Sequence, residues 1–191
     1  MTETSIRLKN RLSDDAFFEL CQMNELRMER LKNGTIIIME PTGSGTGYFN
    51  SEITSEVRTW NKEHREGLSF DSSSGFTMPD TSVKSPDTAW IAKDRWQQLA
   101  ADLREKFAPI APDFVVEIRS KTDSLKELQA KMHEYIANGV RLAWLMDRKN
   151  RVTYIYRLDG SEAQLSFDET LSGEDVLVGF LLKIADIEVM D

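Results

Sequence analysis

The stretch Pro112-Asp113-Phe114-Val115-Val116-Glu117-Ile118-Arg119-Ser120 decides the fold, because it places a carboxylate inside an apolar strand. A second segment, Ser85-Pro86-Asp87-Thr88-Ala89-Trp90, is also a short strand entered through Pro-Asp. A purely structural strand avoids such a residue, since an unpaired buried charge is costly or changes its pKa until it is neutral. The two segments therefore predict that Asp87 and Glu117 share a metal ion.

Side-chain alternation along the strand predicted at 114–119 puts Glu117 and Arg119 on the same face. This is the geometry of an acid-x-lysine motif with arginine in the lysine position. Arginine keeps its proton at any ordinary pH and cannot act as a general base, but it can stabilise negative charge. We therefore expect Arg119 to support the reaction by its charge, and we look elsewhere for a lysine.

The helix after this strand carries a candidate lysine. Ser124 and Glu127 form a capping box, and Asn138-Gly139 is a natural end. At about 100° per residue, Lys131 lies about 40° outside the apolar stripe and beside Tyr135. The stripe consists of Leu125, Leu128, Met132, Tyr135 and Ile136. Two interpretations stay equally open: a catalytic lysine, or one whose stem covers apolar surface while its amine reaches water.

The N-terminal half predicts two helices and a β-hairpin. A helix is expected at about 14–23 with Phe17, Leu20 and Cys21 facing inward, and strands at 25–31 and 35–39 should join in a two-residue turn at Asn33-Gly34. The glycine-rich run 41–47 should break regular structure. A helix should follow it to about residue 63, because four apolar residues recur at helical spacing: Phe49, Ile53, Val57 and Trp60.

The rest of the chain alternates strands and helices. Strands are expected at 67–78 and 83–92, followed by a connecting helix at 95–107 whose crossover suits parallel or mixed pairing. Residues 142–146 and 152–156 should form a hairpin, while the apolar run 176–187 fits either a strand or a helix. These elements predict an α/β fold.

Composition narrows the functional classes. The 191 residues, 40% of them hydrophobic, suit a single domain, 1–191. No export signal and no run of about 18 apolar residues occurs, so we expect a cytoplasmic protein without a membrane partner. One cysteine and two histidines exclude a disulfide framework and a Cys/His zinc site within the chain. Any metal should be held by oxygen.

Charge is distributed unevenly along the chain. The net charge is −8, but segment 159–191 has nine acidic residues against Lys183 alone, so residues 1–158 balance 23 acids with 23 bases. Arg119, Lys121, Lys126 and Lys131 cluster around the second carboxylate segment, although a solvated surface of mixed charge is the ordinary interpretation of any one of them. The neutral body is compatible with a nucleic-acid substrate. The acidic C-terminal segment 159–191 should pack on the core or on a partner subunit.

Several motifs together carry a resemblance to a known family. They are Met39-Glu40-Pro41-Thr42-Gly43, Ser85-Pro86-Asp87, Pro112 to Glu117, Lys131-Met132-His133-Glu134-Tyr135, Gly139-Val140 and Trp144-Leu145-Met146-Asp147. In this combination the chain resembles the Uma-type restriction endonucleases of the PD-(D/E)XK nuclease superfamily over about residues 14–180. The resemblance implies a restriction-endonuclease-like mixed central sheet flanked by helices, bound Mg²⁺ and hydrolysis of phosphodiester bonds.

Carried over residue by residue, the resemblance matches Asp87 and Glu117 to the motif acids and Lys131 to a lysine on the following helix. Many members have a histidine after the Pro-Thr-Gly turn, whereas this chain has Thr46 near that position, so a histidine-dependent step is excluded. The expected function is a Mg²⁺-dependent DNA endonuclease, with Mn²⁺ as a substitute. Cutting both strands of a duplex favours a homodimer.

Two further questions stay open at this level. Glu52 and Glu56 lie within about 60° of one end of the apolar stripe of their helix, so either could supply an additional metal ligand or be an ordinary solvated glutamate. The alternative to an enzyme is a non-catalytic metal- or nucleic-acid-binding regulatory module that retains the nuclease fold, because a fold does not establish an activity.

Overall fold

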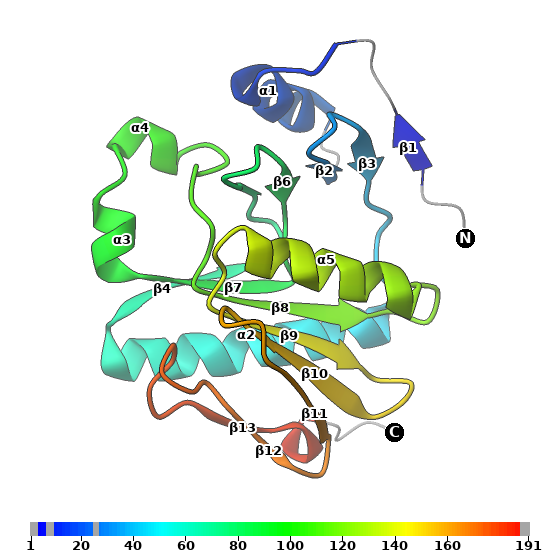
Figure 1. Cartoon of the computed structure of the whole chain (residues 1–191), viewed down its shortest axis with the longest axis vertical. Helices are drawn as coiled ribbons and strands as arrows, with labels where there is room; N and C mark the ends of the chain where they lie inside the picture. Colours follow the sequence, from blue (N-terminus) through cyan, green and yellow to red (C-terminus); the bar gives the residue numbers. More distant parts are fainter. Residues whose placement is uncertain (1–3, 7–9, 25–26, 188–191) are drawn as a thin grey trace.

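A mixed six-stranded sheet forms the centre of the computed structural model, which describes residues 4–6, 10–24 and 27–187 (Figure 1). Its strand order is β11-β10-β9-β8-β7-β4. β8 and β9 are parallel, and the other neighbouring pairs in this sheet are antiparallel. The bounds are β4 Gly67–Asp71, β7 Thr88–Ala92, β8 Phe114–Arg119, β9 Leu142–Asp147, β10 Val152–Arg157 and β11 Glu162–Ser166. The expected mixed central sheet is confirmed.

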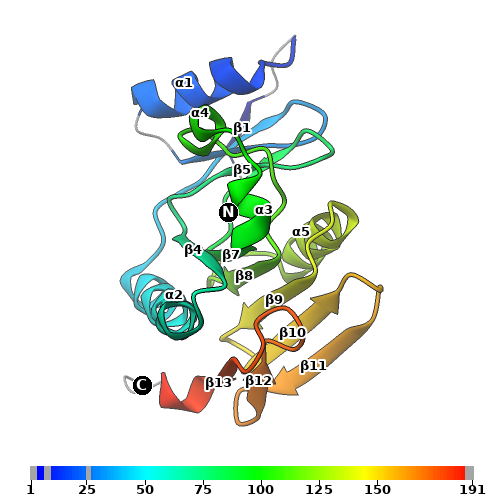
Figure 2. The same cartoon turned by 90° about the vertical axis from the view of Figure 1, so that its left-hand side faces the viewer.

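Two helices cover opposite faces of this sheet (Figure 2). α2 (Ser44–His64) packs on one face with the four apolar residues predicted for it, and α5 (Leu125–Ala137) packs on the other through Met132 and Tyr135. Side chains of β8 point alternately to the two faces of the sheet: Val116 packs in the core on the α2 side, and Val115 packs in the core on the α5 side. Glu117 is two residues beyond Val115 and therefore on the same face of β8, so its side chain points to the α5 side.

A second, five-stranded sheet has the order β1-β3-β2-β6-β5 and lies beyond α5 in Figure 1. Its strands are β1 Thr4–Ile6, β2 Met28–Arg30, β3 Ile36–Ile38, β5 Phe76–Thr77 and β6 Val83–Lys84. The helix α1 (Asp14–Asn24) covers it with Phe17 and Cys21. The predicted hairpin β2–β3 is confirmed, but Leu31 N–H donates to the Thr35 carbonyl, so the loop holds three residues, with Gly34 at φ +84°.

Three expectations about chain segments were wrong. The runs 67–78 and 83–92 are not single strands, because each is shared between the two sheets: β4 and β7 belong to the central sheet, and β5 and β6 to the second. Segment 95–107 forms two short helices, α3 (Lys93–Gln97) and α4 (Ala101–Arg104), rather than one. The Arg104 guanidinium bonds the carbonyls of Gln97 and Leu99, which ends the first helix. The two strands that this segment connects, β7 and β8, are antiparallel, so the connection is not a parallel crossover.

The glycine-rich run also differs from expectation, because α2 already begins at Ser44 and includes Gly45 and Gly47. Glycine can adopt helical angles, and the amide of Gly47 donates to the Gly43 carbonyl at 3.0 Å. The predictions for α1, for α5 with its Ser124 cap, and for the β9–β10 hairpin are confirmed.

The C-terminal segment wraps the α2 side of the central sheet. It contains β12 (Thr170–Ser172), β13 (Leu181–Lys183) and the 3₁₀ turn η1 (Ile184–Asp186), so 176–187 is neither one strand nor one helix. Phe167, Leu177 and Phe180 join the core cluster of α2, and the Trp60 indole donates to the Val178 carbonyl at 3.1 Å. Within the described residues, no helix has both the length and the apolar content needed to cross a membrane.

Candidate active site

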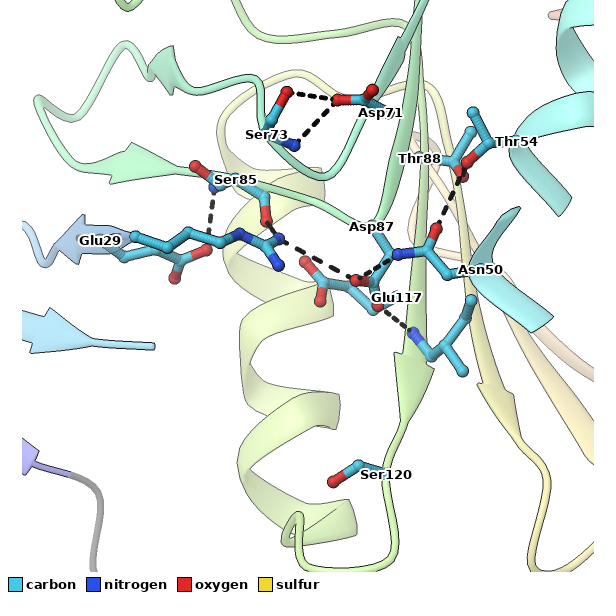
Figure 3. A network of polar contacts seen from close by, with 12 residues as sticks. Glu29, Asn50, Thr54, Asp71, Ser73, Ser85, Asp87, Thr88, Glu117 and Ser120 are labelled. Carbon is cyan, nitrogen blue, oxygen red and sulfur yellow. Dashed lines mark hydrogen bonds and ion pairs between the residues drawn. The ribbon is translucent and has the colours of Figure 1, made fainter. Parts of the chain in front are cut away.

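Asp87 and Glu117 are brought together because β7 and β8 are neighbours. Asp87 stands immediately before β7, and its Oδ2 accepts the Ile118 amide of β8 at 2.8 Å. Its Oδ1 accepts a hydrogen bond of 3.2 Å from the side-chain amide of Asn50, a residue of α2 (Figure 3). Burial nevertheless dominates, and the pKa of Asp87 is raised despite the bond from Ile118.

Glu117 lies deeper than Asp87, with 5% of the residue exposed. Its Oε1 accepts the Tyr135 hydroxyl at 2.7 Å and lies 2.8 Å from the Lys131 amine. Burial raises the pKa of Glu117 to about 7, Lys131 opposes that rise, and the neighbouring charges of Asp87 and Glu29 reinforce it. Glu117 is therefore a carboxyl group whose negative charge the protein alone does not fully compensate.

Lys131 connects the two sheets. Its Nζ lies 2.8 Å from Glu117 and 2.9 Å from Oε1 of Glu29, and 13% of its side chain is exposed. Burial by itself would lower the pKa of Lys131, but the two carboxylates raise it above its usual value, so the lysine is charged. Its amine is directed toward buried carboxylates rather than toward water.

Glu29 is the residue of this site that sequence reasoning missed. It comes from β2 of the second sheet, is 5% exposed, and accepts the Ser85 amide at 2.9 Å (Figure 3). Burial would raise the pKa of Glu29, but Lys131, Lys84 and the Ser85 amide together hold it below its usual value. The signal was present, because Glu29 is a carboxylate in the middle of a short strand, as Glu117 is.

Three residues predicted as site candidates, Arg119, Glu52 and Glu56, are not part of this cluster. Arg119 lies two residues beyond Glu117 at the C-terminal end of β8, where its guanidinium bonds the Asp147 carboxylate at 2.7 Å and the Asp123 carbonyl. Glu52 and Glu56 line a groove of about 390 Å³ with β12, β13 and η1. Asn50 faces Asp87, and a residue two positions further along a helix is turned about 200° away from it. The structure therefore unites Asp87, Glu117 and Lys131, but does not bring Arg119 or Glu52 to them.

The donor set fits a hard divalent cation. Asp87 and Glu117 influence one another electrostatically, and Oε2 of Glu117 accepts no hydrogen bond from any described residue. Carboxylate oxygens are the ligands that Mg²⁺ prefers, and it usually takes one or two and keeps several waters. In the described ranges, no three His, Cys, Asp or Glu side chains are grouped to hold a metal. Asp87 and Glu117 are thus the two carboxylates that we consider as candidate metal ligands.

Comparison with known proteins identifies the fold and the family. A crystal structure described as a putative nuclease belonging to DUF820, from Anabaena variabilis ATCC 29413, matches with a TM-score of 0.75 and 20% identity, over 92% of this chain and 97% of that one. The chain therefore shares the fold of that protein. The Uma2 family model, described as "Putative restriction endonuclease", matches residues 14–185, so the chain belongs to the Uma2 family. A search of curated proteins gave no match.

Proposed function

We propose that this protein is a Mg²⁺-dependent endonuclease that hydrolyses phosphodiester bonds in DNA. The observation that carries the proposal is the cluster in which Asp87 and Glu117 from adjoining strands meet Lys131 from the following helix. Family membership supports a nuclease, and the raised pKa values of Asp87 and Glu117 support a site that gains from an added cation.

Each residue of the cluster has a distinct role. Asp87 and Glu117 would hold Mg²⁺, or Mn²⁺ in its place, through their oxygens. The bound ion supplies polarisation of the scissile phosphate and a lower pKa for a coordinated water. Lys131 places a permanent positive charge 2.8 Å from Glu117, where it offsets negative charge developing on the phosphate. Tyr135 fixes the Glu117 carboxylate through its hydroxyl, and Asn50 with Ile118 fixes Asp87.

The proposal assigns the lysine role to Lys131 rather than to Arg119. The Lys131 amine contacts Glu117, one of the two proposed ligands, whereas the Arg119 guanidinium contacts Asp147, a carboxylate outside the cluster. A homodimer remains part of the proposal, because two copies related by a two-fold axis can cut both strands of a duplex. Light scattering during size-exclusion chromatography measures that state directly.

The test is cleavage of supercoiled plasmid at low ionic strength with Mg²⁺ or Mn²⁺. Wild type should nick and linearise the plasmid, and Glu117→Gln should lower the rate by at least about a hundredfold, since it removes a metal ligand and its charge. Glu56→Gln, an exposed change on α2, is the matched control and should cut normally. A wild-type protein that cuts neither DNA nor RNA, yet binds Mg²⁺ through these carboxylates, is instead the non-catalytic module.

A further inference from the structure

The C-terminal end of α2 lies beside β4 and α3 at the edge of the central sheet (Figure 1). A basic hollow is lined by residues of these elements. Its volume is about 700 Å³, within the usual range of roughly 300 to 1,000 Å³ for small-molecule sites. The residues that line it are Asn61, Lys62, Arg65, Gly67, Leu68, Lys93, Trp96, Gln97 and Arg104. Four of them are cationic and none is acidic, in a chain whose net charge is −8.

Three of the four cations of this hollow have no acidic partner among the described residues. In the part of the chain that the structure describes, no carboxylate lies within ion-pair distance of Lys62, Arg65 or Lys93. Arg104 is instead held by the carbonyls of Gln97 and Leu99. Uncompensated positive charge concentrated in a concave surface attracts an anion.

Arg65 occupies a position that normally favours glycine. It ends α2 in the left-handed conformation, at φ 57° and ψ 30°, with its amide donating to the Asn61 carbonyl. Glycine is the usual residue at such a helix end, because a Cβ is unfavourable there. The chain thus has an arginine where backbone conformation alone would favour glycine, and this side chain contributes to the cationic lining.

The remaining wall of the hollow is apolar and aromatic. Trp96 and Leu68 line it, and the Arg104 guanidinium lies 6.0 Å from the centre of the Trp96 ring. Phe70 supports the indole from the sheet, with ring centres 5.2 Å apart. A ligand that satisfies both walls needs a negative group for the cations and a flat, weakly polar group for the indole. We propose that this hollow binds a nucleotide, with its phosphate among Lys62, Arg65 and Lys93 and its base against Trp96.

This site is separate from the carboxylate cluster. In the β4–β7 ladder, Gly67 pairs with Ala92 at the end beside the hollow, and Asp71 pairs with Thr88 at the end beside Asp87. The two ends are about 13 Å apart at roughly 3.3 Å per residue. The inference therefore stands whether or not the protein is a nuclease. The nucleotide has two sources: a free nucleotide, or one unit of a nucleic-acid strand that passes over this edge.

The experiment is calorimetric titration at low ionic strength in EDTA, which removes any contribution of metal at the carboxylates. The ligands are AMP, adenosine, inorganic phosphate and a short single-stranded oligoadenylate. The test variant is Lys62→Ala with Arg65→Gly, and glycine suits the left-handed position, so the fold should be kept or stabilised. The control is Lys32→Ala with Lys126→Ala, which removes the same charge from exposed positions outside the hollow.

We expect saturable binding of AMP that the test variant weakens at least about tenfold, or about 1.4 kcal/mol, while the control keeps it within about twofold. Tighter binding of the oligoadenylate, lost in the test variant, identifies a nucleic-acid strand as the source; equal or weaker binding identifies the free nucleotide. The proposal is overturned if AMP does not bind saturably, or if both variants lose binding equally. It is also overturned if phosphate or adenosine alone binds as tightly as AMP.

Discussion

Glu29 and Glu117 come from different sheets, are each 5% exposed, and share the amine of Lys131. Their pKa values nevertheless move in opposite directions: that of Glu29 is lowered and that of Glu117 is raised to about 7. Glu29 gains from a second lysine, Lys84, and from the Ser85 amide. Glu117 has Asp87 and Glu29 as negative neighbours, and Lys131 does not fully offset them.

The difference shows that partners, rather than burial, decide which buried carboxylate carries a stable charge. The second sheet supplies a complete set of partners for Glu29. The central sheet leaves Glu117 beside Asp87 with an excess of negative charge, and an excess of that kind is what a divalent cation relieves. Under the proposed function, Glu29 is therefore the residue that positions Lys131, and Glu117 is a proposed metal ligand.

The largest expected effect is that of Lys131→Met, which leaves two buried carboxylates without their shared cation. Removing one partner of a buried ion pair costs about 3 to 5 kcal/mol. The free energy of unfolding should fall by about this amount at pH 8 and recover partly toward pH 5, as Glu29 and Glu117 take up protons. Cleavage should be lost as well. Urea unfolding over that pH range, together with the plasmid assay, measures both effects.

Lys126→Met on the same helix is the matched control, because Lys126 is exposed and lines no part of the cluster. A Lys131→Met protein as stable as this control at pH 8 would show that Lys131 does not hold the two sheets together electrostatically.

Replacing each carboxyl group by an amide tests whether Glu117 and Glu29 differ in this way. Glu117 has a raised folded pKa, so its contribution to stability is fully present below the unfolded value and is lost as pH rises toward about 7. Between pH 5 and pH 8, the free energy of unfolding of metal-free Glu117→Gln should therefore rise relative to that of wild type, by on the order of 3 kcal/mol. Urea unfolding in EDTA across this range measures the gain.

Glu29→Gln should behave in the opposite way. A lowered folded pKa gives stability that is present above the unfolded pKa and is lost as pH falls through the folded value. Glu29→Gln should thus be less stable than wild type throughout pH 5 to 8, with the gap closing only below about pH 4. If the stability of the two variants depends on pH in the same way, the pKa values of Glu29 and Glu117 do not move in opposite directions.

The next effect concerns metal and is smaller. Mg²⁺ that binds only the folded protein should raise its stability by about 2.7 kcal/mol at a hundred times its dissociation constant. Asp87→Asn should remove that gain, while the metal-free variant should be as stable as wild type or more so, because burial raises the pKa of Asp87. Glu52→Gln should keep the gain, since Glu52 lines a different groove. Melting curves with Mg²⁺ and with EDTA distinguish the two variants.

The sequence was informative where local patterns act alone. Alternation in β8, the stripe of α5 and the hairpin glycine Gly34 all depend on near neighbours, and their predicted elements are present. Lys131 was correctly placed beside Tyr135, whose ring centre is 5.8 Å from its amine. A carboxylate inside a short strand drew attention to Glu117, which the structure buries beside Lys131, and the same signal is present at Glu29.

What the sequence could not supply is contact between distant segments. Glu29 and Lys131 are 102 positions apart in the sequence. They come together because β2, which carries Glu29, pairs with β6, and the chain runs from β6 directly to Asp87. No periodicity within 67–78 or 83–92 marks the point where the chain passes from one sheet to the other. The binding partner of Arg119 was hidden in the same way, since Asp147 becomes its neighbour only through the parallel pairing of β8 with β9.

The smallest expected effect is that of Arg119→Ala. Its guanidinium bonds Asp147, which Asn150 also bonds through its side chain at 2.7 Å, so Arg119→Ala leaves the buried carboxylate with one partner. We expect a loss of about 1 to 2 kcal/mol in the free energy of unfolding. Cleavage should fall less than about tenfold when Arg119→Ala is assayed well below its melting temperature, because Lys131 keeps its place beside Glu117. A loss of cleavage as complete as that of Lys131→Met, in a protein that remains folded, would instead transfer the charge-stabilising role to Arg119.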